Sequence, residues 1–184
     1  MTETPSRVGL AVIAYPELEP GDLAWIENIR ADADPNHGLI GPHFTLVYPT
    51  NVLSPDEMSA HVRERLAENS MIDFVLRGIA IDDARDQGEI YVFLVPNEGR
   101  DAIAALHDSL YAGPLEAELR VDLPYRPHMT IGRLPERVAA DRLISELALQ
   151  DVDISGTVAE VQVVDCTSTD FGTLDTIPFA SLPG

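Results

Sequence analysis

Apolar and polar positions follow two periods along this chain, one typical of strands and the other of helices. Segments rich in apolar and β-branched residues predict strands over 7–15, 43–49, 73–81, 89–95, 126–133, 158–166 and 171–179. Apolar positions three and four residues apart predict helices over 22–32, 98–111 and 136–149, and a further helix after Ser54. Helices therefore alternate with strands along most of the chain.

Polar residues and prolines indicate where several of these elements begin and end. Asp22 is placed to cap the first helix, and Ser54 with Glu57 has the spacing of a capping box around a first-turn proline. The polar segment 82–88 joins the two central strands and predicts an antiparallel hairpin. Pro178 favours an edge or strand-end position for the last strand.

This order of elements indicates an α+β fold and not a doubly wound parallel sheet. We expect one domain over 1–184, because the chain is long enough to bury a substantial core. The sequence contains no glycine-rich phosphate loop of either familiar spacing. The apolar run over 8–15 is too short to span a bilayer, so we expect no membrane association.

Composition limits the partners that this protein can bind. The formal net charge is −19, and all 12 basic residues are arginines. Such a surface repels long nucleic acid but still allows a small anion in a local arginine-containing pocket. Cys166 is the one cysteine and is expected to be a buried small hydrophobe. With no secretory signal in the sequence, these features predict a cytoplasmic protein, which we expect to be a monomer.

One short phrase occurs twice in the sequence. Pro42-His43-Phe44-Thr45-Leu46 recurs as Pro127-His128-Met129-Thr130-Ile131. A histidine with these flanks arises by chance at roughly one in a thousand in this composition, so two copies among 5 histidines need another explanation. Each copy follows a strand-and-helix unit and precedes a helix, which predicts two similar halves related by a pseudo-twofold axis.

Strand alternation explains the spacing within each copy. His43 and Thr45 share one face of their strand, and His128 and Thr130 share one face of theirs. The intervening apolar residues point to the core. A twofold relation between the halves then places both polar pairs in one cleft.

Such a cleft suits acid–base chemistry on a phosphodiester. One neutral imidazole takes a proton from the attacking group, and the other, protonated, gives one to the leaving oxygen. The hydroxyls of Thr45 and Thr130 can donate hydrogen bonds to the non-bridging phosphoryl oxygens. This chemistry needs no metal and no other cofactor.

The phrases over 41–49 and 125–133 resemble the signatures of the two-histidine (2H) phosphoesterase superfamily. That superfamily includes bacterial and archaeal RNA 2′,3′-cyclic phosphodiesterases once named 2′-5′ RNA ligases. The resemblance covers most of the chain in element order, although only these two phrases are specific. It implies a bilobal, duplicated α+β fold with antiparallel sheets, flanking helices and an active-site cleft between the lobes.

The resemblance also implies roles for the repeated residues. His43 with Thr45 and His128 with Thr130 become catalytic pairs, with His43 as proton donor and His128 as acceptor. The activity it implies is opening of a 2′,3′-cyclic phosphate or cleavage of a related 2′-5′ linkage. Because a protein with a net charge of −19 repels a polyanion the size of a tRNA, we expect the substrate to be a small nucleotide or a short RNA end.

Several residues near the motifs are further candidates for substrate contact. Arg126 shares the parity of His128 and is a candidate phosphate ligand. Arg133 is a second candidate phosphate ligand: strict alternation turns it to the opposite face, although it follows Gly132, where a bulge could redirect it. Tyr125 could stack on a base but lies off parity, and Tyr48 also lies off parity and is expected to pack or to lie at a lobe edge.

Other interpretations remain open at this stage. The repeated histidines could be structural, the cleft could bind a nucleotide phosphate or regulate a partner without turnover, or the histidines could be metal ligands. No carboxylate lies at ligand spacing from either histidine, which counts against the metal interpretation. We expect His37 in an exposed turn and His61 and His107 at helix surfaces or boundaries.

Overall fold

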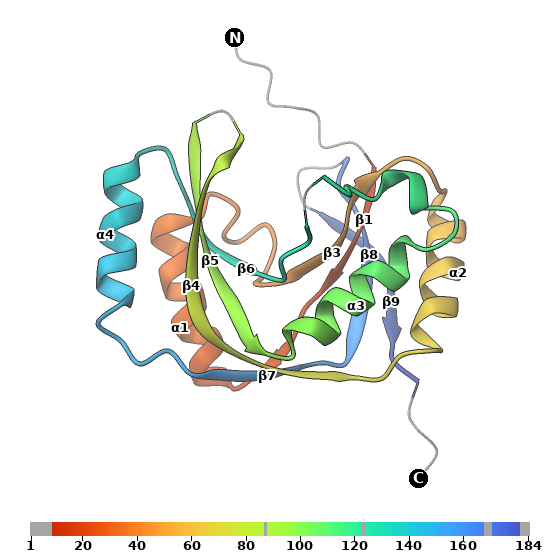
Figure 1. Ribbon diagram of the computed structural model, residues 1–184, viewed down its shortest axis with the longest axis horizontal. Helices are drawn as coiled ribbons and strands as arrows, with labels where there is room; N and C mark the ends of the chain where they lie inside the picture. Colours follow the sequence, from red (N-terminus) through yellow and green to blue (C-terminus); the bar gives the residue numbers. More distant parts are fainter. Residues whose placement is uncertain (1–8, 87, 123, 168–170, 181–184) are drawn as a thin grey trace.

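The structure, a computed structural model, describes residues 9–86, 88–122, 124–167 and 171–180, without the side chains of 84–86. Among these residues nine strands form one antiparallel sheet with the order β2-β7-β4-β5-β6-β3-β1-β8-β9 (Figure 1). The strands are β1 (Leu10–Ala14), β2 (Glu17–Leu18), β3 (Phe44–Thr50), β4 (Ile72–Asp86), β5 (Glu89–Glu98), β6 (Met129–Leu134), β7 (Ile154–Val158), β8 (Glu160–Asp165) and β9 (Gly172–Pro178). The α-helices of this part of the chain are α1 (Pro20–Ala33), α2 (Pro55–Leu66), α3 (Arg100–Tyr111) and α4 (Arg137–Leu147).

The sheet is strongly curled, and its two halves meet where β3 lies beside β6 (Figure 1). We call β3, β1, β8 and β9 the β3 half, and the five strands from β6 to β2 the β6 half. Helices α2 and α3 pack on the β3 half, whereas α1 and α4 pack on the β6 half. The predicted α+β fold with two duplicated lobes is confirmed, and the lobes share a continuous sheet.

The duplication can be followed element by element. The order β1-α1-β3-α2 in the first unit corresponds to β5-α3-β6-α4 in the second. The first helix of each unit crosses to the other half, because α1 packs against β6 and α3 packs against β3. Each half is therefore completed by a helix from the other unit, which ties the two units together.

A row of apolar residues crosses the middle of the sheet. Ala14 pairs with Phe44, Phe44 with Met129, and Met129 with Leu94, so the row runs over β1, β3, β6 and β5. All of these side chains are fully buried. The Phe44 ring also meets the ring of Phe74 edge to face, with 5.1 Å between centroids. This row forms the centre of the core beneath the repeated motifs.

The helices begin largely as the sequence predicts, with one correction. The capping box of α2 is present, because the Ser54 hydroxyl accepts from the Glu57 N–H and the Glu57 side chain accepts from the Ser54 N–H. The predicted cap at Asp22 is wrong. Helix α1 begins two residues earlier at Pro20, because proline fits the first helical position, and Asp22 lies in its first turn. Within the described residues, no helix has the length and apolar content needed to cross a bilayer.

The strands show larger differences from the sequence prediction. Strand β4 continues to Asp86, so most of the segment 82–88 belongs to the hairpin ladder. Strands β2 and β7 were not predicted, because β2 has two residues and β7 carries buried apolar residues only at its ends. Pro178 ends the edge strand β9, as predicted. Arg7 and Val8 of the first predicted strand lie outside the described residues.

Truncation of Phe44 tests the central row. Phe44→Ala removes a fully buried ring that contacts both Met129 and Phe74, so we expect the free energy of unfolding to fall by about 3–5 kcal/mol. Urea unfolding followed by circular dichroism measures this change. The control is Val138→Ala on the exposed side of α4, which should change stability by about 0.5 kcal/mol or less. Equal effects of the two substitutions would show that the row does not hold the halves together.

Candidate active site

The sheet register brings the repeated residues together. Phe44 and Met129, the first residues of the antiparallel strands β3 and β6, form the one pair between them among the described residues. The residues on either side of this pair are therefore neighbours, Thr45 with His128 and His43 with Thr130. Since Phe44 and Met129 point into the core, the two histidines and two threonines form one cluster on the other, concave face, where each is partly exposed. We call these residues the HxT cluster.

The two imidazoles are held in the same way. Nδ1 of His43 lies 2.8 Å from the carbonyl oxygen of Gly41, and Nδ1 of His128 lies 2.6 Å from that of Arg126. A carbonyl oxygen can only accept, so each Nδ1 carries the proton and donates it. In the neutral form each Nε2 is then the acceptor nitrogen of its ring, and in the charged form it carries a proton. The geometry therefore prepares one nitrogen of each ring for proton transfer.

Aromatic side chains flank each imidazole. The ring of Phe93 on β5 lies 4.0 Å from that of His128, and Tyr15 meets His43 edge to face at 6.0 Å. Burial lowers the pKa of His43 below its ordinary value, and the hydrogen bond to Gly41 opposes this only in part. His43 is therefore biased towards the neutral form in the free protein. Sequence reasoning missed Phe93 and Tyr15, because only the strand register places them beside the motifs.

Each motif strand carries a bulge just after its threonine. Ile13 pairs with Thr45 but Val12 pairs with Val47, so Leu46 is an extra residue in β3. Phe93 pairs with Thr130 but Val92 pairs with Gly132, so Ile131 is extra in β6. The pseudo-twofold relation thus extends to the irregularities of the strands.

These bulges decide where two further candidates point. Val47 faces the core, so Tyr48 after it turns to the face of the HxT cluster, where its exposure fits the expected lobe-edge position and not packing. Arg133 pairs with Tyr91, which shares the face of Phe93, so the bulge redirects Arg133 to the concave face. Its guanidinium is 2.7 Å from a carboxylate oxygen of Glu89.

Arg126 and Tyr125 precede β6 and do not belong to it, so strand parity does not decide their direction. Arg126 is exposed, and none of the ion pairs among the described residues includes it. The Tyr125 hydroxyl donates to the carbonyl of Thr45 at 2.8 Å. Its ring stacks on the ring of His107, with centroids 3.7 Å apart and 3° between the planes. One face of Tyr125 is therefore covered by the protein itself.

The remaining histidines lie outside the HxT cluster. His37 is exposed in its turn, as predicted, with Nε2 3.1 Å from a Glu27 carboxylate oxygen. The prediction of surface or boundary positions for His61 and His107 is wrong, since both are buried. Each is held by a backbone carbonyl at 2.7 Å, His61 by Leu110 and His107 by Leu46. Both carbonyls come from other elements, so helical periodicity gives no sign of this burial.

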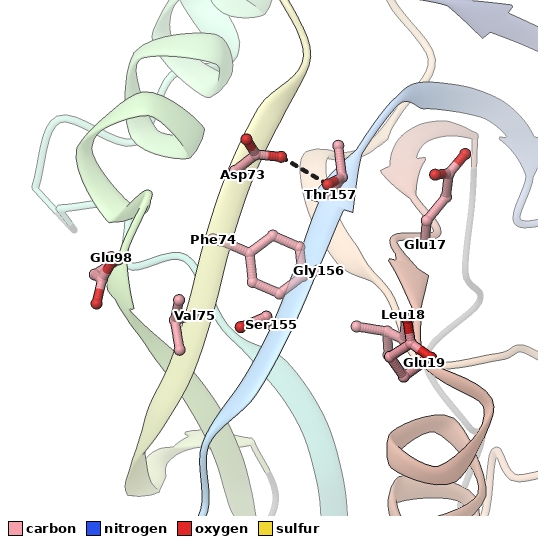
Figure 2. A pocket seen from close by; sticks show the side chains of 10 residues that line it. All are labelled: Glu17, Leu18, Glu19, Asp73, Phe74, Val75, Glu98, Ser155, Gly156 and Thr157. Atoms are coloured by element: carbon pink, nitrogen blue, oxygen red, sulfur yellow. Dashed lines mark hydrogen bonds between the residues drawn. The ribbon is translucent and has the colours of Figure 1, made fainter.

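Acidic residues gather elsewhere on the molecule. A hollow of about 520 Å³ at the β2–β7–β4 end of the sheet is bordered by carboxylates of Glu17, Glu19, Asp73 and Glu98 (Figure 2). Asp73 accepts a hydrogen bond from Thr157, and the other three carboxylates would repel a phosphate. Among the described residues, no group of three or more histidine, cysteine or acidic side chains is placed to hold a metal ion.

Sequence comparisons relate most of the chain to known proteins. Residues 18–170 match the family model of the 2′-5′ RNA ligase superfamily. The chain is 30% identical over 149 residues to a Bacillus pumilus protein whose name assigns it to the phosphoesterases, and the match covers 80% of this chain and 82% of that one. A Geobacillus kaustophilus protein with the same kind of name is 30% identical over 150 residues, with 80% and 82% covered.

Solved structures share the fold at low sequence identity. A structure named as a phosphoesterase superposes with a TM-score of 0.58 at 14% identity, over 95% of this chain and 99% of that chain. Usb1 of Kluyveromyces marxianus superposes with a TM-score of 0.57 at 13% identity, over 95% and 100% of the two chains. A further structure of that Usb1 contains uridine monophosphate and superposes with a TM-score of 0.56 at 9% identity, over 94% and 99%.

The protonation of His43 can be measured directly. Because burial lowers its pKa, His43 in the free protein should titrate below 6.5 and be neutral at pH 7. Nuclear magnetic resonance of the imidazole Cε1 protons between pH 4.5 and 8 gives this value, and the spectrum of His43→Asn assigns the signal. A His43 signal that titrates above 6.5 would contradict the dominant role of burial.

Proposed function

Because the chain belongs to the 2′-5′ RNA ligase superfamily of two-histidine phosphoesterases, we propose that it is a metal-independent phosphodiesterase. Membership gives the chain a phosphoesterase type of activity. The specific reaction that we propose is opening of a 2′,3′-cyclic phosphate, or cleavage of a related 2′-5′ linkage, on a small nucleotide or short RNA end. The observation that carries this proposal is the HxT cluster, in which two identically held imidazoles share one face with two hydroxyls.

The proposed reaction is an addition of water across a phosphorus–oxygen bond. Nε2 of His128 takes a proton from the attacking water while the water oxygen bonds to phosphorus. The bond from phosphorus to one ester oxygen breaks, and His43 gives that oxygen a proton from Nε2. The products are a phosphate monoester and a free hydroxyl. Thr45 and Thr130 donate hydrogen bonds to the non-bridging oxygens, where the transition state holds its negative charge.

The lowered pKa of His43 sets a condition on this mechanism. A proton donor must be charged before the leaving oxygen departs, yet burial biases His43 to the neutral form in the free protein. The negative charge of a bound phosphodiester opposes this bias, because a nearby anion stabilises an imidazolium. His43 therefore takes up its proton as the substrate binds. The pseudo-twofold symmetry also lets a substrate bound in the reverse direction exchange the two roles.

Charge supports a small substrate. The net charge of −19 opposes the many phosphate contacts that long nucleic acid needs. Arg126 offers a local exception, because it is exposed beside the HxT cluster and none of the described ion pairs includes it. The Usb1 fold relative that contains uridine monophosphate supports a nucleotide of this size as ligand.

Removal of either histidine tests the catalytic proposal. We expect His43→Ala and His128→Ala each to lower kcat by about 10²–10⁴-fold, because each removes one proton-transfer step. Thr45→Val and Thr130→Val should each lower kcat by about 10²–10³-fold through loss of one donor to the transition state. The measurement is hydrolysis of the four nucleoside 2′,3′-cyclic monophosphates in the presence of chelator, with the 2′- and 3′-monophosphate products separated.

The matched control is His37→Ala, which removes an exposed histidine outside the HxT cluster and should retain wild-type turnover. Full activity in both histidine variants would rule out the mechanism. Tight nucleotide binding by the wild type without any product would identify a binding module that uses the same face.

Arg126 is expected to contribute to substrate binding. Arg126→Gln removes a charge-assisted hydrogen bond to a phosphate oxygen, so KM should rise by about tenfold with a smaller change in kcat. Arg142→Gln on the exposed side of α4 is the control for loss of one positive charge from this acidic chain. If both substitutions raise KM equally, Arg126 acts through net charge and not through contact with the substrate.

A further inference from the structure

A cavity lies beside the HxT cluster, at the edge of β3 that turns away from β1. It has a volume of about 640 Å³ and is bounded by the end of β3, by α3 and by residues 118–121 and 124–126. That size lies within the range of pockets that enclose small organic ligands. Its lining includes Tyr48, His107, Asp108, Tyr111, Tyr125 and Arg126. Residues 124–126 pass beside β3 before the chain reaches His128 and β6 (Figure 1).

The aromatic walls of this cavity are fixed by hydrogen bonds to β3. The Tyr125 hydroxyl donates to the carbonyl of Thr45, and His107 Nδ1 lies 2.7 Å from the carbonyl of Leu46. The Tyr111 hydroxyl accepts from the backbone N–H of Tyr48 at 3.1 Å. Each of these three rings thus has one polar atom bonded to the backbone of β3. His107 and Tyr111 are buried, so Tyr48 and Tyr125 are the rings that offer surface to a ligand. The walls are preformed and need little ordering when a ligand binds.

None of the four residues of the HxT cluster lines the cavity, but its wall adjoins the cluster, because the Tyr125 hydroxyl bonds to the Thr45 carbonyl. Tyr125 and Arg126 stand just before His128, and Tyr48 follows Thr45 by three residues on the same face. A group bonded to a phosphate at the cluster is therefore within reach of the cavity. Because the cavity adjoins the cluster, its expected occupant is a part of the substrate itself and not an unrelated ligand.

The charges around the cavity offer little to hold a second phosphate. Two carboxylates, Asp108 and Glu118, face two arginines in the lining. Of these, Arg120 pairs with Asp122, and Arg126 is the proposed ligand of the phosphate at the HxT cluster. Glu118 accepts a hydrogen bond from the Thr50 hydroxyl at 3.2 Å, whereas Asp108 is exposed and takes part in none of the ion pairs among the described residues. The carboxylate of Asp108 can accept a hydrogen bond from a ligand N–H but cannot donate one.

We propose that this cavity, which we call the base pocket, holds the nucleobase of the substrate whose phosphate lies at the HxT cluster. It favours bases with an exocyclic amino group, because Asp108 can accept from that group, whereas uracil presents a carbonyl oxygen at the equivalent position. The inference rests on the proposed function for the position of the phosphate. It adds a preference for base identity that the acid–base chemistry of the histidines does not provide.

Equilibrium binding separates the contributions of base and phosphate. The probes are cytidine monophosphate, uridine monophosphate (2′ and 3′ isomers of each) and ribose 5-phosphate, measured by titration calorimetry. Wild type should bind the cytidine nucleotide about tenfold more tightly than ribose 5-phosphate, because a base packed on aromatic walls adds affinity. It should bind the cytidine nucleotide about fivefold more tightly than the uridine nucleotide, through the hydrogen bond to Asp108.

Two variants and one control locate these differences in the base pocket. Tyr48→Ala should reduce the advantage of cytidine monophosphate over ribose 5-phosphate, and its thermal unfolding shows whether the variant is folded. Asp108→Asn should abolish the preference for cytidine over uridine while the advantage over ribose 5-phosphate remains. Asp101→Asn, an exposed substitution in the first turn of the same helix, should change neither ratio.

The possible results distinguish this inference from the catalytic proposal. Equal wild-type affinities for cytidine monophosphate and ribose 5-phosphate would overturn the base pocket, whatever the turnover measurements show. An equal loss of both affinities in folded Tyr48→Ala would also overturn it. If no cyclic phosphate is hydrolysed but the base-dependent affinity is present and depends on Tyr48, the base pocket stands and the catalytic proposal fails.

Discussion

The pairing of Phe44 with Met129 is the contact on which the rest of the site depends. Both side chains are driven to the core side, where they continue a buried row from Ala14 to Leu94. Once this row is buried, strand alternation places the neighbouring residues on the opposite, concave face. The hydrophobic effect that joins the halves therefore also gathers the histidines and threonines. A shift of one residue in this pairing would turn the polar groups into the core, so stability and chemistry depend on the same register.

The duplication repeats more than the motif. Each unit has a bulge after its threonine, and each bulge turns the fifth residue after the histidine to the concave face. The residues at these equivalent positions differ, with Tyr48 in one half and Arg133 in the other. Acid–base chemistry benefits from two equivalent imidazoles, whereas recognition of a substrate with distinct ends needs two different surroundings. The halves accordingly agree at the HxT cluster and differ around it.

Electrostatics leaves few cations available in this acidic protein. Most of the described arginines pair with carboxylates, including Arg30 in the core and Arg133 on the concave face. Arg126 differs, because it is exposed beside the HxT cluster and takes part in none of these pairs. A single cation on a negatively charged surface can bind a small anion. It cannot bind a polyanion, which needs several cationic contacts. In the proposed reaction this charge distribution would restrict the size of the substrate, and the proposed base pocket would recognise its base.

The sequence predicts what depends on local pattern and does not predict what depends on long-range register. The repeated motif, the capping box at Ser54 and the terminal position of Pro178 are each recognisable from a few neighbouring residues, and the structure contains the last two as predicted. The faces on which Tyr48 and Arg133 lie do not follow from local pattern. They depend on bulges that only the pairing with β1 and β5 reveals. His107 was expected at a helix boundary, but the carbonyl that holds it comes from β3 and the ring that stacks on it comes from the segment before β6. In a duplicated fold the repeat thus identifies the candidate catalytic residues, whereas the proposed recognition depends on residues that are distant in sequence and that the register brings together.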